Sequence, residues 1–217
     1  MTLAGPALVA VVDHLRDELS EIESIFAGCI GDRSVARYRV PYVPSEDGCL
    51  IALYDAWVRF MRELLLTSCS GPVLGLAGHT HIPATARNSQ TAIDHLRRNR
   101  RGTKISFLGG EPKWADAAAV SDLTTVLGLA NGGTIVSAVT ASAVTLGVTT
   151  VPNPLEQIRA CRNYVSHKGP TAMAQVRVAI AGQFSDMTSV LRRRHLGVEI
   201  FSEWIESCLA LAEVAAQ

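Results

Sequence analysis

Hydrophobic residues recur at helical spacing in long segments of the chain. Residues 6–27 carry an apolar side chain every three or four positions, with charged residues between them. The apolar set is Leu8, Val11, Val12, Leu15, Leu19, Ile22 and Phe26. This spacing predicts an amphipathic helix. A second helix is predicted from Ser45, which can cap its N-terminus, to the glycine-rich stretch that begins at Gly71.

Further helices are predicted over residues 84–101, 112–127, 154–167, 171–193 and 198–215. Two segments interrupt this pattern. Residues 29–45 contain two prolines and are expected to form an extended connection. In residues 131–152, an NGG turn signal and the β-branched residues after it favour a short β-hairpin or a loop insertion. Because there is no internal repeat and no long linker, we expect a single all-α domain over residues 1–217, built as a helical bundle.

The composition limits the kinds of function that the chain can have. With 217 residues, 48% of them hydrophobic, the chain is long and apolar enough to bury a core. Its 20 basic and 20 acidic residues give a formal net charge of zero. A strongly basic protein attracts nucleic acid through its overall field, and this chain does not. Any contact with RNA must therefore come from local patches.

The cysteines and the uncharged segments bear on localisation. The five cysteines are widely spaced and form no CxxC pair, which favours free thiols in a reducing compartment over disulfides or a zinc site. No Lys or Arg precedes Arg16, so no secretory signal is recognised. The longest uncharged stretch lies between Asp122 and Glu156 and is rich in Thr, Ser and Gly, unlike a membrane-spanning helix. We expect a soluble, cytoplasmic protein without membrane contact.

The helix predicted to end in the string RNYVSH has an unusual polar face. At 100° per residue, with Arg162 at zero, Ser166 lies at about 40° and Arg159 at about 60°. Asn163 then lies at about 100° and His167 at about 140°. The opposite arc carries Ile158, Cys161, Tyr164 and Val165. We therefore expect the helix to bury one side and to expose two Arg, an Asn, a Ser and a His on the other.

This set of side chains suits the cleavage of RNA without a metal. The 2′-hydroxyl of RNA can attack the adjacent phosphate if a group that titrates near neutrality removes its proton, and histidine is such a group. Arginine can neutralise the charge that develops on the phosphate oxygens. Asn163 precedes His167 by four residues, so the two are neighbours on a helix. The sequence contains no acidic cluster to bind a metal, and no cofactor is expected.

The string RNYVSHKG resembles the signature of the HEPN superfamily, in which an Arg, often followed by a polar residue, precedes a His near the end of a helix. The resemblance implies an all-α HEPN-like bundle, here with extra helices, and homodimerisation that brings two motifs together. It also implies metal-independent endoribonuclease activity, often in prokaryotic toxins or antiviral effectors. In members that pair with a nucleotidyltransferase antitoxin, a Tyr follows the His by two residues. Gly169 occupies that position, so the resemblance does not extend to that form of control.

We therefore predict an endoribonuclease that cleaves single-stranded RNA. Its predicted catalytic residues are Arg162, Asn163 and His167, and its predicted substrate-binding residues are Arg159, Ser166 and Lys168. Because the wheel separates the catalytic Arg and His by about 140°, one helix does not readily direct both at one phosphate. A composite site in a homodimer would solve this problem. The expected partners are RNA, a second copy of the chain, and a cognate antitoxin or regulatory protein. The alternative is a non-catalytic HEPN-like module that dimerises or binds RNA or protein.

Other polar features have ordinary explanations. His79 and His81 have no third metal ligand nearby in the sequence. The basic runs at residues 97–101 and 192–195 could guide an RNA backbone, but solvated helix ends are the favoured explanation. The aromatic residues Tyr54, Trp57 and Phe60 follow helical spacing and are expected in the core, as is Cys161.

Overall fold

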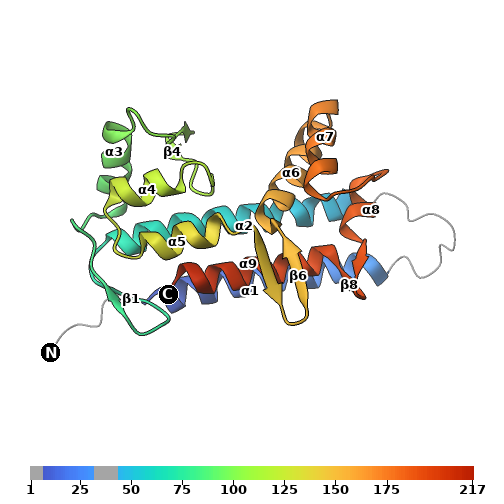
Figure 1. Cartoon of the computed structure of the whole chain (residues 1–217), viewed down its shortest axis with the longest axis horizontal. Coiled ribbons are helices and arrows are strands. Elements are labelled where there is room, and N and C mark those ends of the chain that lie inside the picture. The colour runs from blue at the N-terminus through green and yellow to red at the C-terminus, as the bar shows by residue number, and fades with distance from the viewer. Residues whose placement is uncertain (1–6, 32–43) are drawn as a thin grey trace. The chain divides into compact units, whose positions relative to one another are not determined.

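The computed structural model of the chain describes residues 7–31 and 44–217, and helices dominate these residues (Figure 1). The helices are α1 (Leu8–Gly31), α2 (Pro44–Cys69), α3 (Ser89–Asn99), α4 (Val120–Leu127), α5 (Gly132–Val139), α6 (Pro154–His167), α7 (Pro170–Ala179), α8 (Met187–Leu191) and α9 (Ile200–Ala215). The prediction of a mainly α-helical fold is confirmed. None of the helices in the described ranges combines the length and the apolar character that crossing a bilayer requires.

The described residues also contain short antiparallel strand pairs, each isolated from the others. They are β1 (Val73–Leu74) with β2 (Thr80–His81), β3 (Phe107–Leu108) with β4 (Glu111–Pro112), β5 (Ala143–Leu146) with β6 (Thr149–Pro152), and β7 (Arg194–His195) with β8 (Val198–Glu199). These ribbons connect helices and do not assemble into a larger sheet, so the fold remains mainly helical.

Four predicted helices correspond closely to α1, α2, α6 and α9. Two others begin later than predicted. The helix expected from residue 84 begins at Ser89, because the side chain of Asn88 accepts the backbone N–H of Thr91 at 2.9 Å and so caps it. The helix expected from residue 112 begins at Val120, since Pro112 pairs with Phe107 in the β3–β4 ribbon.

The segment 131–152 is part helix and part hairpin. The predicted hairpin is present as β5–β6. The residues directly after the NGG string, however, form α5 rather than a turn and a strand. Ile135, Ala138 and Val139 of this helix are buried. Burial of these side chains outweighs the preference of β-branched residues for extended structure, which is a weak one.

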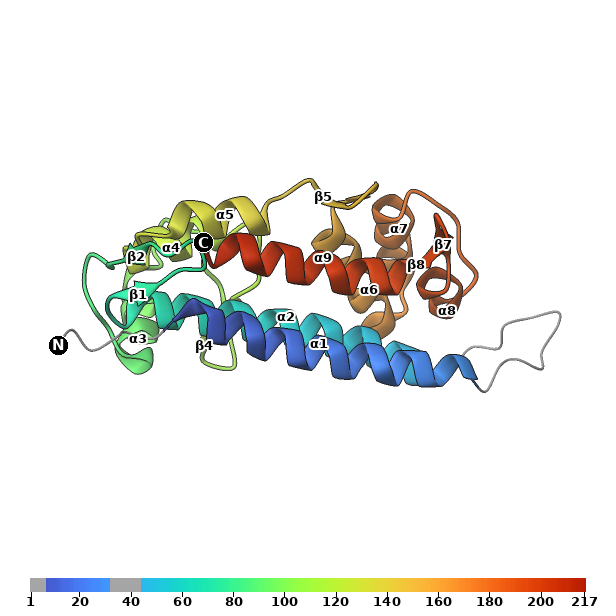
Figure 2. The same cartoon turned by 90° about the horizontal axis from the view of Figure 1, so that it is seen from below.

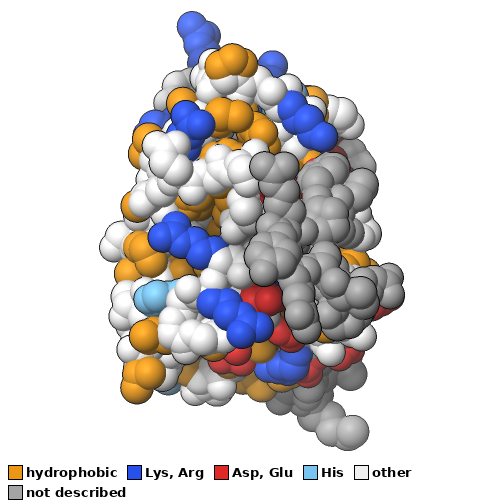
Figure 3. All heavy atoms as spheres, turned by 90° about the vertical axis from the view of Figure 1, so that its right-hand side faces the viewer, with side chains coloured by type: hydrophobic (Ala, Val, Ile, Leu, Met, Phe, Trp, Pro, Cys, Tyr) orange, Lys and Arg blue, Asp and Glu red, His pale blue; other side chains and the backbone are white. Residues whose placement is uncertain are grey.

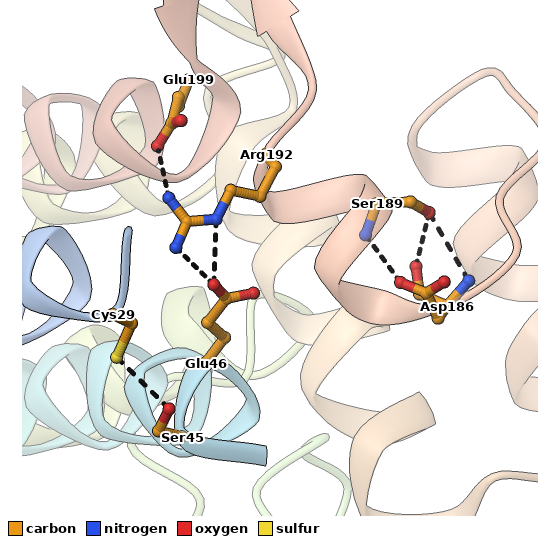
Figure 4. A network of polar contacts seen from close by, with 7 residues as sticks. All are labelled: Cys29, Ser45, Glu46, Asp186, Ser189, Arg192 and Glu199. Atoms are coloured by element: carbon orange, nitrogen blue, oxygen red, sulfur yellow. Dashed lines mark hydrogen bonds and ion pairs between the residues drawn. The ribbon is translucent and has the colours of Figure 1, made fainter. Parts of the chain in front are cut away.

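The helix predicted over residues 171–193 is divided. It ends as α7 at Ala179, and Ala181 follows with φ of 48°, a backbone conformation that a helix cannot contain. α8 then begins with a capping box in which Asp186 accepts the N–H of Ser189 at 2.8 Å (Figure 4). The extended connection predicted for residues 29–45 lies largely outside the described residues, and its first three residues continue α1.

The chain divides into two compact units, which we call unit 1 and unit 2. Unit 1 comprises Met1–Leu15, Trp57–Ala141 and Leu211–Gln217, and unit 2 comprises Arg16–Ala56 and Ser142–Ala210. α1, α2 and α9 contribute residues to both units. The prediction of a single domain stays a prediction.

Unit 2 has an aromatic core between its long helices. Within this unit α1 and α9 lie side by side in both views (Figures 1 and 2). The rings of Phe26 in α1 and Phe201 in α9 pack with centroids 4.1 Å apart, and Trp204 is fully buried nearby along α9. Burying each of these rings contributes about 2 kcal/mol or more through removal of apolar surface from water. The unit therefore has its own hydrophobic core.

In unit 1, an ion pair fixes the β3–β4 ribbon to α2. Arg62 donates two hydrogen bonds to Glu111, at 2.7 and 2.8 Å, and Trp114 donates a third at 2.8 Å. The hydrogen bonds from Arg62, and secondarily that from Trp114, lower the pKa of the Glu111 carboxyl. Both charged side chains are about two-fifths exposed, so solvent screens much of the attraction.

The Glu111 carboxylate should make the stability of the protein depend on pH. A folded-state pKa below the unfolded value means that the contribution is complete above the unfolded value, about 4.3, and is lost as the pH falls through the folded value. We expect Glu111→Gln to lower the free energy of unfolding at pH 7 by about 0.5–1 kcal/mol, and the difference from wild type to vanish in acid. Urea unfolding between pH 3 and 8 measures this. Arg62→Gln should cause a similar loss, and the double variant little more; an equal loss at pH 3 and 7 would contradict the assignment.

Candidate functional site

The candidate site lies in unit 2, on the C-terminal half of α6. The side chain of Gln157 is buried, and both polar atoms of its amide make hydrogen bonds that fix α6 in place. Its Nε2 donates to the carbonyl of Pro152 at 2.7 Å, and its Oε1 accepts from the indole N–H of Trp204 at 2.8 Å. Ile158 and Cys161 are buried beside it, as the wheel predicted. The side of α6 that carries the polar set is thereby turned away from the core.

The buried side of α6 has no reactive group. Burial raises the pKa of the Cys161 thiol to about 12, so the thiolate that a nucleophile requires is scarce at neutral pH. This agrees with the expectation that Cys161 contributes packing. Tyr164 was expected on the buried arc but is only half-buried, and its ring makes an edge-on contact with Phe184 at 5.3 Å. That contact holds α6 against the segment that follows α7.

On the polar face, Arg162 contacts an aromatic ring of α2. It is half-buried, and its guanidinium lies over the ring of Tyr54 in α2, 5.4 Å from the centroid. Its Nε is buried and has no hydrogen-bond partner, and among the described residues no carboxylate pairs with it. A cation on an aromatic face is held in place without being neutralised. Arg162 can therefore bind an anion.

Tyr54 is a residue of the candidate site, although its helical spacing predicts a place in the core. Trp57 and Phe60 are buried as expected, with ring centroids 5.2 Å apart. Tyr54 is half-buried instead, and its ring faces Arg162. The helical spacing of the three aromatic residues predicts burial for all of them. Only the packing of α2 against α6 within unit 2 distinguishes Tyr54 from the others.

Arg159 has an acidic partner one helical turn away. It donates to both carboxylate oxygens of Glu156, at 2.9 and 2.7 Å. Arg159 is one of the predicted substrate-binding residues. The pair is about half exposed, and exposed helical ion pairs are worth only a few tenths of a kcal/mol. A phosphate could displace the carboxylate, so the role in substrate binding stays a prediction.

The remaining residues of the set lie in the last turns of α6. Asn163 is half-buried, whereas Ser166, His167 and Lys168 are exposed. Lys168 has φ of 47° and donates its backbone N–H to the carbonyl of Tyr164 at 2.7 Å, which ends the helix. No hydrogen bond joins Asn163 to His167. The predicted residues of the helix thus lie along one arc of α6, but no hydrogen bond connects the imidazole of His167 to Arg162.

Figure 3 shows one face of the molecule, on which Lys and Arg side chains are scattered among apolar and uncharged ones, while acidic side chains gather toward the lower edge. Within the described ranges, no group of three or more His, Cys, Asp and Glu side chains could hold a metal ion. Of the two histidines at positions 79 and 81, His81 in β2 contacts the backbone carbonyl of Gln217 through its Nε2 at 2.7 Å.

Comparison of the chain with protein-family models, with curated proteins and with solved structures finds no match.

Proposed function

We propose that the chain is a HEPN-like, metal-independent endoribonuclease that cleaves single-stranded RNA, as a toxin or an antiviral effector. The observation that carries the proposal is the state of Arg162, which lies on the Tyr54 ring with no carboxylate partner among the described residues. An arginine held this way is prepared for a phosphate. The exposed His167, five residues later on the same helix, supplies a proton-transfer group.

In the proposed reaction, the 2′-hydroxyl of one nucleotide loses its proton to a base and its oxygen attacks the adjacent phosphorus. The bond from phosphorus to the 5′-oxygen breaks, and that oxygen receives a proton. His167 acts as the base or the acid of these transfers. Arg162 stabilises the negative charge on the phosphate oxygens at the transition state. Asn163 orients His167 or the phosphate, and Arg159, Ser166 and Lys168 hold the substrate.

We further propose that the active form is a homodimer with a composite site. Arg162 and His167 lie about 140° apart around α6, so a single helix does not readily direct both at one phosphate. A second copy of α6 could place the His of one protomer near the Arg of the other. The partners are then RNA, the second copy, and a cognate antitoxin or regulatory protein that restrains the activity.

The test is cleavage in the absence of divalent metal. The purified protein, incubated with unstructured single-stranded RNA in buffer with EDTA, should produce fragments that end in a 2′,3′-cyclic phosphate and begin with a 5′-hydroxyl. Enzymatic end-labelling and mass spectrometry identify these ends. A requirement for added Mg²⁺ or Mn²⁺, or fragments with a 5′-phosphate, would refute the mechanism.

A second candidate function is a non-catalytic module that dimerises or binds RNA or protein. It is favoured by one observation, namely that no hydrogen bond holds the His167 ring toward Asn163 or Arg162 in α6. For this function the polar face would serve only as an interface. Intact RNA after prolonged incubation, together with a stable dimer mass, would support the module over the enzyme.

A further inference from the structure

Positive charge is concentrated in one segment of unit 1, although the whole chain is neutral. Residues 94–113 contain six Lys and Arg residues and only two acidic ones. The basic residues are Arg97, Arg98, Arg100, Arg101, Lys104 and Lys113. The segment consists of the last turns of α3, the loop after it and the β3–β4 ribbon. A neutral chain that gathers this much charge in one place has a local positive field.

Both acidic residues of the segment are already engaged. Asp94 pairs with Arg97 at 3.0 Å, and Glu111 pairs with Arg62 of α2. A third carboxylate, Asp122, lies beside the segment and accepts the backbone N–H of Lys104 at 2.7 Å. The structure gives no carboxylate partner to Arg98, Arg100 or Arg101 among the described residues. These three guanidinium groups are exposed to solvent.

An aromatic ring organises the cluster. The guanidinium groups of Arg97 and Arg100 each lie 5.7 Å from the centroid of the Phe107 ring. Arg97 also donates to the carbonyl of Gly110 at 2.8 Å, which ties α3 to the turn of the ribbon. Cation–π contacts and this hydrogen bond fix part of the cluster before any ligand binds. We call Arg98, Arg100, Arg101 and Phe107 the basic cluster.

We propose that the basic cluster binds the phosphate backbone of single-stranded RNA. Arginine forks phosphate oxygens and its flat guanidinium stacks on bases, whereas lysine offers a point charge, and all the cations of the cluster are arginines. A dipole effect at the end of α3 explains cations in the last helical turn, but Arg100 and Arg101 lie beyond that turn. That the nucleic acid is RNA rests on the proposed function. The cluster lies in unit 1 and the α6 residues lie in unit 2, so binding here is a separate property.

The experiment measures RNA binding without cleavage. The full chain with His167→Ala is titrated into a fluorescent 20-nucleotide oligouridylate, and fluorescence anisotropy gives Kd at several salt concentrations. We expect Arg98→Gln/Arg100→Gln/Arg101→Gln to raise Kd at least tenfold at 0.1 M salt. The slope of log Kd against log salt should fall by about 2, because each phosphate contact on a single strand contributes about 0.7. The matched control, Arg98→Lys/Arg100→Lys/Arg101→Lys, keeps the charge and should raise Kd less than about threefold.

Each outcome decides the proposal. Unchanged Kd and salt slope in the Gln triple variant, with an unchanged melting temperature, would overturn it. So would binding to vesicles that contain phosphatidylserine together with no binding to the oligouridylate, because the cluster would then recognise lipid headgroups. If the wild-type protein fails to cleave RNA, this binding test is unaffected, because the anisotropy measurement uses the His167→Ala protein, which is not expected to cleave. Conversely, if the protein cleaves RNA but the Gln triple variant binds RNA with the same Kd, the proposal for the basic cluster is refuted and the proposed function stands.

Discussion

The His167→Ala variant is expected to lose about 10²–10⁴-fold in the rate of RNA cleavage, the range that general acid–base groups contribute. The physical reason is that a hydroxyl attacks phosphorus slowly unless its proton leaves during the attack. Because His167 is exposed in the last turn of α6, its removal should change the free energy of unfolding by less than about 0.5 kcal/mol. The measurement is the single-turnover cleavage rate in EDTA, together with urea unfolding.

A histidine elsewhere provides the control for this prediction. His79 is exposed in the loop between β1 and β2 in unit 1, and His79→Ala should cleave RNA at the wild-type rate. Mixing His167→Ala with Arg162→Ala protomers tests the composite site, because a mixed dimer would contain one complete set of residues. Partial recovery of cleavage on mixing is expected. Full activity of the His167→Ala protein would show that the imidazole of His167 takes no part in the reaction.

Local sequence signals predicted the bounds of α6 and the burial of Ile158 and Cys161 well. Pro154 at the start, Gly169 and Pro170 after the end, and the alternation of Ile158 and Cys161 with polar residues all act within one helix. Such signals require no knowledge of the rest of the fold. They also predicted α1, α2 and α9, whose apolar residues recur over many turns.

Two of the predictions that failed depended on contacts distant in sequence. α5 is helical because Ile135 and Val139 are buried in unit 1, which no local pattern reveals. Tyr54 belongs to the candidate site because α6 brings Arg162 onto its ring, across more than 100 residues of chain. Spacing on a helix identifies a face, whereas the partner of that face depends on tertiary packing.

In unit 2, a buried ion network should be important for stability. Arg192 donates from its Nε to Glu46 at 2.9 Å and from a terminal nitrogen to the same oxygen, and it reaches Glu199 at 3.4 Å (Figure 4). Its guanidinium also lies 4.5 Å from the centroid of the Phe26 ring. Glu46 is fully buried, and the side chain of Arg192 is 11% exposed. The network therefore joins α2, the end of α8 and β8 within water-poor surroundings.

We expect Arg192→Met to lower the free energy of unfolding by about 3–5 kcal/mol, measured by urea unfolding. Removing the arginine takes from the buried Glu46 carboxylate the two hydrogen bonds that Arg192 donates, so the cost of keeping that charge out of water is offset less. The matched control is Arg194→Met, an exposed neighbour that should cost less than about 0.5 kcal/mol. Adding Glu46→Gln to Arg192→Met should recover part of the loss, since the buried charge that lost these hydrogen bonds disappears. A loss below about 1 kcal/mol for Arg192→Met would mean that water or a rearranged side chain solvates Glu46, and the network would then be an incidental contact.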